Sequence, residues 1–163
     1  METLSFPITR DYLVPPRTER SVVFNSNGLN KAEYRLVRSI AEKVFRGVER
    51  RFPGALLRCT FYAEYGYPVL VKAISKSKSA IDPKIKGCDA NPFDQHYWLS
   101  FSLQRGTQNA DVLIDPIFGY VGLEDKAREV LSSDYLRYYR ESRTVSHGIP
   151  AWEGGIRIKT IGI

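Results

Sequence analysis

The chain has few of the residues that define several common classes of protein. Its 163 residues contain two cysteines, two histidines and one methionine. Two cysteines are too few for a disulfide scaffold, and neither lies in the CxxC or HxxxH spacing that typically binds zinc. We therefore expect free thiols and no metal or organic cofactor, while a single Cys59–Cys88 bridge would depend on geometry that a sequence does not give.

Long apolar runs are also missing. No stretch approaches the roughly 20 apolar residues that a transmembrane helix needs. The first residues hold Pro7, Pro15 and Pro16 and no apolar segment typical of a signal peptide. These absences predict a cytoplasmic protein without membrane association. The length suits one domain over residues 1–163, and the sequence shows no internal repeat and no domain-scale linker.

The charge is unbalanced, with 24 Lys and Arg against 18 Asp and Glu, a net charge of +6. Basic residues cluster at Lys72, Lys76, Lys78, Lys84 and Lys86. Together with Tyr65 and Tyr67, they offer contacts for a phosphate backbone and stacking surfaces for bases. No motif of a known nucleic-acid-binding domain accompanies them, so a solvated basic surface is the favoured interpretation and nucleic acid a weaker alternative.

Helical patterns dominate the first half of the chain. Apolar residues recur at helical spacing over 30–51, with Asn30 as N-cap, Glu33 completing a capping box, and Pro53-Gly54 as the end. We predict a second helix over 55–65, because Ala55, Leu56, Cys59, Tyr62 and Ala63 share one face and Gly66 supplies a C-terminal stop. Residues 1–28 are expected to be irregular or extended, with a short strand at 21–24.

Strand patterns follow. Alternation over 69–74 predicts a strand inside the sheet, and 75–95 has the composition of a long polar loop. Residues 96–103 and 111–114 alternate like a hairpin around a turn at 105–109. Shorter elements are expected as helices over 123–131 and 134–140, with Ser133 as the N-cap of the latter, and as a last strand over 156–160. The predicted fold is α+β, with an antiparallel sheet against which the N-terminal helices pack.

One arrangement of residues suits cysteine catalysis. A thiolate nucleophile is usually generated by an adjacent histidine, and a third group fixes the orientation of that histidine. Cys59 lies on a helix before the sheet, His96 opens one hairpin strand, and Asp115 ends the other. The start of one hairpin strand lies beside the end of the next, so His96 and Asp115 are expected at the same end of the sheet.

The residues around this triad resemble transglutaminase-like and papain-like cysteine enzymes over about residues 54–120. His96-Tyr97-Trp98-Leu99 and Val112-Leu113-Ile114-Asp115-Pro116 are similar to the histidine and aspartate strands of that superfamily. Cys59-Thr60-Phe61-Tyr62-Ala63, followed by Gly66-Tyr67-Pro68-Val69, is similar to its nucleophile helix and the strand after it. The resemblance implies a papain-like core and hydrolysis, deamidation or acyl transfer on a protein or peptide amide.

The spacing departs from that family pattern, because Cys59 precedes Gly66 by only about two helical turns. Either Cys59 lies near the N-terminus of a short helix, or the nucleophile is lost and the fold serves as a binding protein with a basic face. Cys88 in the long loop is a second candidate nucleophile, and Asp111 competes with Asp115 because both fall on one strand face.

The resulting hypothesis assigns a role to each residue. Cys59 attacks the acyl carbon, His96 moves the proton, Asp115 orients His96, and Trp98 shapes the substrate pocket or simply packs. The alternative is a catalytically inactive papain-like domain that binds a protein or nucleic acid. His147, the second histidine, lies in a loop by composition and is interpreted as a surface residue.

Overall fold

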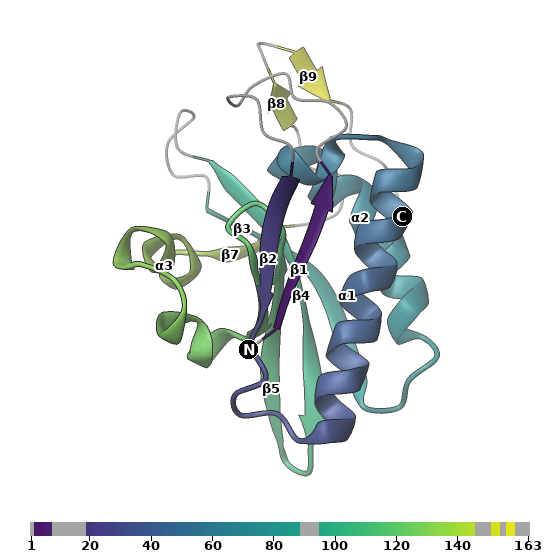
Figure 1. Cartoon of the computed structure of the whole chain (residues 1–163), viewed down its shortest axis with the longest axis vertical. Coiled ribbons are helices and arrows are strands. Elements are labelled where there is room, and N and C mark those ends of the chain that lie inside the picture. Colours follow the sequence, from purple (N-terminus) through teal and green to yellow (C-terminus); the bar gives the residue numbers. More distant parts are fainter. Residues whose placement is uncertain (1, 8–18, 89–94, 146–150, 154–155, 159–163) are drawn as a thin grey trace.

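A computed structural model describes residues 2–7, 19–88, 95–145, 151–153 and 156–158. Within these residues, seven strands form one sheet in the order β1-β2-β6-β5-β4-β3-β7 (Figure 1). The strands are β1 (Glu2–Pro7), β2 (Glu19–Phe24), β3 (Ala80–Cys88), β4 (His96–Arg105), β5 (Gln108–Asp115), β6 (Tyr120–Leu123) and β7 (Arg143–Val145). Every neighbouring pair is antiparallel except β2 and β6. The predicted α+β class is therefore confirmed.

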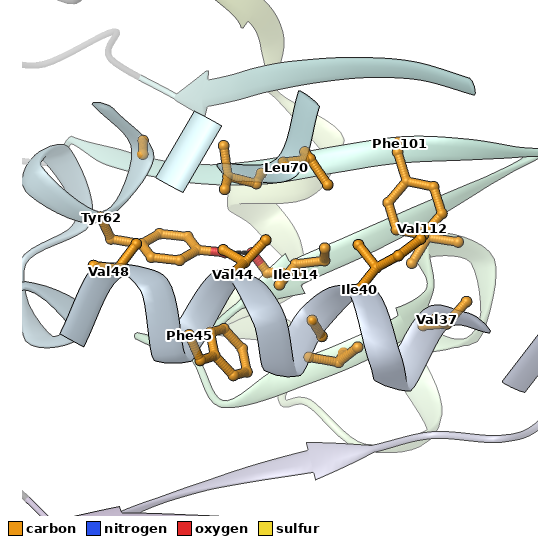
Figure 2. Close-up of a cluster of buried hydrophobic side chains, with 14 of the residues drawn as sticks. Val37, Ile40, Val44, Phe45, Val48, Tyr62, Leu70, Phe101, Val112 and Ile114 are labelled. Atoms are coloured by element: carbon orange, nitrogen blue, oxygen red, sulfur yellow. Dashed lines mark hydrogen bonds between the residues drawn. The ribbon is translucent and has the colours of Figure 1, made fainter. Parts of the chain in front are cut away.

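Helix α1 (Lys31–Arg51) begins where the sequence predicts. The Asn30 side chain accepts a hydrogen bond from the Glu33 backbone N–H at 2.8 Å, and the Glu33 carboxylate accepts one from the Asn30 N–H at 3.0 Å. This capping box satisfies two N–H groups that the first helical turn leaves without partners. The apolar face of α1 is buried: Val44 and Ile40 lie toward Ile114, Val112 and Phe101 of the sheet, and Val48 lies beside Tyr62 (Figure 2).

Helix α2 (Cys59–Ile74) corrects two predictions at once. The predicted helix over 55–65 is in fact a short 3-10 turn η1 (Ala55–Leu57) followed by α2, which continues through Gly66 and Pro68 across the predicted strand. Gly66 lies inside the helix and does not end it, because the close packing at this position leaves no room for a side chain. A Cβ on Gly66 would lie 2.9 Å from the Leu99 side chain, so only glycine lets α2 approach the sheet this closely.

Strand β3 lies within the predicted loop over 75–95 and takes up 9 of its residues. It pairs with β4 along most of its length, with Cys88 opposite His96. The register shifts between Ile81 and Lys84, and this irregularity contains Pro83. A bulge tolerates a proline that a regular ladder would exclude, which is why the sequence looked irregular there. Residues 89–94 lie outside the described residues.

The hairpin is confirmed, although both strands are longer than predicted and the turn is confined to Gly106-Thr107. On the face of the sheet away from α1 and α2 lie the 3-10 helix η2 (Glu124–Glu129) and α3 (Ser133–Arg140) (Figure 1). Ser132, rather than Ser133, is the residue before α3. Both faces of the sheet are thus covered, which explains why β4 is buried at eight successive residues.

The chain ends contain more strand than predicted. The stretch 1–28, expected to be irregular or extended, contains β1 and β2, and β2 includes the predicted strand at 21–24. The last predicted strand is β9 (Ile156–Ile158), which pairs with β8 (Ala151–Glu153) in a separate two-stranded sheet. His147 lies outside the described residues. No helix in the described part of the chain is long and apolar enough to span a bilayer.

Candidate active site

His96 and Asp115 meet at one end of the central hairpin. His96 is the first residue of β4 and Asp115 the last of β5, and the antiparallel pairing of these strands brings them together. The His96 Nε2–H donates to Asp115 Oδ2 at 2.6 Å. Both side chains are buried, Asp115 completely and His96 to all but 3% of its surface. The hydrogen bond therefore lies in a low-dielectric site, where it fixes the orientation of the imidazole.

Asp115 accepts hydrogen bonds from four donors. Its Oδ1 accepts from the backbone N–H groups of Ile117 and Phe118, both at 3.0 Å. Its Oδ2 accepts from His96 and from the Tyr139 hydroxyl at 2.8 Å. A buried carboxylate is costly unless it is paired and hydrogen-bonded, and this one is both. The turn after β5 and helix α3 together hold the carboxylate in place.

Aromatic rings surround the His96 imidazole. The Phe118 ring stacks on it, with centroids 3.8 Å apart and planes 17° from parallel. Trp98 stacks at 5.3 Å, and Tyr138 meets the imidazole edge-on at 5.9 Å. This wall excludes water from one side of the imidazole and limits its rotation, so that a single ring nitrogen faces Asp115.

The environment of His96 favours its protonated form. Burial lowers the pKa of His96, but the charge of Asp115, its hydrogen bond and the Cys59 side chain outweigh burial and raise the pKa from 6.5 to about 9. His96 therefore carries a proton at neutral pH. Tyr139 remains a donor, because burial and the neighbouring Asp115 charge raise the pKa of its hydroxyl well above 10.0.

Cys59 lies at the N-terminus of α2, directly after Arg58. Its thiol is free and half-buried, and its Sγ is 4.0 Å from the Gln95 carbonyl oxygen, the residue before His96. The Cys59 side chain also lies near enough to His96 to help raise the pKa of that histidine. Because Nε2 faces Asp115, Nδ1 is the nitrogen available to the thiol. Cys59 therefore lies at a helix N-terminus, as one interpretation of the unusual spacing expects, but the helix is 16 residues long rather than short.

The anchoring of α2 places Cys59 over this end of the sheet. Tyr62, one turn into the helix and fully buried, donates its hydroxyl to the Ile114 carbonyl oxygen on β5 at 2.8 Å. Ile114 directly precedes Asp115. One hydrogen bond therefore links the helix that carries the thiol to the strand that carries the carboxylate.

The other candidate residues lie in different environments. Cys88 is buried to 5% exposure at the end of β3, beside His96 rather than in a loop over it. Asp111 accepts a hydrogen bond from the Ser102 hydroxyl, its partner on β4, at 2.8 Å, and it does not contact His96. Trp98 is fully buried, and its ring meets Tyr139 edge-on at 4.8 Å. The ring therefore packs beside His96 and has no exposed surface with which to line a substrate pocket.

Sequence reasoning missed Tyr139 and Phe118. An aspartate before a proline predicts a tight turn, and Phe118 follows Asp115 by three residues. The sequence could therefore have placed Phe118 close to the Asp115 carboxylate. Tyr139 comes from α3 on the far face of the sheet, and no local pattern links it to Asp115. Within the described ranges, no group of three His, Cys, Asp or Glu side chains is arranged to hold a metal ion.

No protein-family model, curated protein or solved structure matches this chain.

Proposed function

We propose that this chain is a cysteine-dependent enzyme that hydrolyses, deamidates or transfers the acyl group of a protein or peptide amide, as transglutaminase-like and papain-like enzymes do. The observation that carries the proposal is the buried 2.6 Å hydrogen bond between His96 and Asp115, with the Cys59 side chain near enough to His96 to help raise its pKa. The three residues come from three elements, and the proposal assigns one role of a cysteine, histidine and carboxylate triad to each of them.

Each residue then has a chemical role. The imidazolium of His96 and the N-terminus of α2 supply the positive potential that a thiolate at Cys59 needs. The thiolate attacks the acyl carbon, and His96 gives its proton to the departing amine, leaving a thioester on Cys59. Water or an amine then attacks the thioester, His96 takes the proton of this nucleophile, and the thiolate is released.

Two features support the remaining requirements of acyl chemistry. The backbone N–H of Cys59 is in the first turn of α2 and has no acceptor within the helix, so it is a suitable donor to the oxyanion of the tetrahedral intermediate. Asp115 needs no proton in this scheme. Its four hydrogen bonds keep it as an acceptor that orients His96 throughout.

The proposal is tested by trapping the thioester with a simple activated ester, p-nitrophenyl acetate. We expect a burst of p-nitrophenolate and one acetyl group on the Cys59 peptide. Cys59→Ser should abolish this adduct, and His96→Ala should slow its formation by about 100-fold or more. Cys88→Ser is the matched control and should leave the burst unchanged. Acetylation confined to lysines, or to Cys88, would contradict the proposal.

The alternative is a catalytically inactive domain of the same fold that serves as a binding protein. The same experiment separates the two, because an inactive domain forms no acyl adduct at Cys59 even with a reactive ester. A free, half-buried thiol near a histidine whose pKa is raised favours the enzyme.

A further inference from the structure

We propose a second site, a basic groove between α1 and α2 that binds a small polyphosphate anion. The groove is open to solvent and has a volume of about 350 Å³, at the lower end of the range of small-ligand sites. Its cations come from both helices: Lys43, Arg46 and Arg50 from α1, and Lys72 and Lys76 from α2. None of the residues that line it is acidic.

The helices form this groove through a close contact at its floor. A Cβ on Gly47 would lie 3.1 Å from a methyl group of Val69, so the missing side chain lets α2 approach α1 here. The cations follow helical spacing on both sides, and the row from Lys43 to Arg50 is roughly 10 Å long. Two facing rows of positive charge therefore flank an apolar floor.

The charges in the groove are largely uncompensated. Arg46 lies 3.5 Å from Glu42, and this is the one ion pair formed by the five cations within the described part of the chain. Like charges three or four residues apart on a helix repel each other, so collecting five of them in one groove lowers stability unless an anion is present. A purely solvated surface would gain nothing from this arrangement.

The chemistry of the cations favours phosphate over carboxylate chains. Two arginines offer paired N–H donors that match phosphate oxygens, and three lysines add point charges around them. Several phosphates close together are needed to satisfy five cations within one small volume. On an extended acidic peptide, carboxylates that face the same way are about 7 Å apart, so the groove would hold only about two of them.

The test measures binding of sodium tripolyphosphate to the full chain by calorimetry at low salt. We expect a dissociation constant below about 1 mM. The double variant Arg50→Glu, Lys72→Glu should weaken binding by at least about tenfold. The matched control, Arg35→Glu with Arg128→Glu, makes the same change in net charge at exposed residues outside the groove and should bind like the wild type. Thermal unfolding confirms that both variants fold.

Other ligands identify the source of the phosphates. Tighter binding of a short oligothymidine, with the same sensitivity to the groove variant, would assign the phosphates to a nucleic-acid strand; weaker binding would assign them to a free polyphosphate. Equal losses in both double variants would mean that only net charge matters and would overturn the site. So would equal affinity for poly-glutamate, or no tripolyphosphate binding at 1 mM.

Discussion

Asp115 shows how one residue can have a local and a long-range role together. By composition, an aspartate before a proline is a common turn residue, and here Oδ1 does cap the turn at Ile117 and Phe118. Its other oxygen, Oδ2, accepts hydrogen bonds from His96 and Tyr139. The turn therefore holds the carboxylate in place independently of its contact with His96, which is the preorganisation that the proposed orienting role requires.

Replacing Tyr139 with phenylalanine tests whether the hydroxyl tunes this carboxylate. Without that donor, the negative charge on Oδ2 is less shared, so the pKa of His96 should rise above its wild-type value of about 9. The lost hydrogen bond to a charged group should also cost about 2 kcal/mol of stability. Titration of His96 by nuclear magnetic resonance and denaturant unfolding measure the two effects.

Tyr135→Phe is the control for this change. Tyr135 is on the same helix, 43% exposed, and its ring packs on Phe118. Removing its hydroxyl should alter neither the His96 titration nor the stability. If Tyr139→Phe likewise left the titration of His96 unchanged, the hydroxyl would be a packing feature and not a positioning group.

At the scale of elements, the helices and strands that could be predicted from sequence are those specified by residues close together in the chain. The capping box of α1 and the alternation of β4 and β5 depend on neighbours in the chain, and both were recognised. Helix α2 was cut short because Gly66 and Pro68 are helix breakers in isolation. The contact of Gly66 with Leu99 exists only after the sheet forms, so tertiary packing overrides the local preference.

Gly66→Ala tests whether the contact with Leu99 outweighs the local preference of glycine for ending a helix. Alanine is the better helix former, so a purely local effect would raise stability by up to about 1 kcal/mol. The contact with Leu99 predicts the opposite sign, a loss of about 1–3 kcal/mol, because the added methyl group overpacks the helix against β4.

Denaturant unfolding decides between the two signs for Gly66→Ala. Ser39→Ala, at an exposed position of α1, is the control and should change stability by less than about 0.5 kcal/mol. A gain in stability for Gly66→Ala would show that α2 and the sheet are not packed as described.

At the scale of the molecule, the candidate site lies at one end of the central sheet, between the layers that cover its two faces. Cys59 comes from the helix layer on one face of the sheet, Tyr139 from the layer on the other, and His96 and Asp115 from the strands between them. The sequence allowed Cys59, His96 and Asp115 to be proposed together, because hairpin pairing fixes two of the three. The Tyr139 contact needs the complete fold, so no local pattern predicted it.

The central claim, an activated thiol at Cys59, is tested most directly by iodoacetamide labelling of the native protein across pH, with the Cys59 and Cys88 peptides measured separately. We predict that Cys59 reacts faster than buried Cys88 and stays reactive at about pH 6, where an ordinary thiol is almost fully protonated. His96→Ala should slow Cys59 by at least about tenfold at that pH. A Cys59 that is inert in the folded protein and reacts only after unfolding would make it a core residue and would contradict the enzyme proposal.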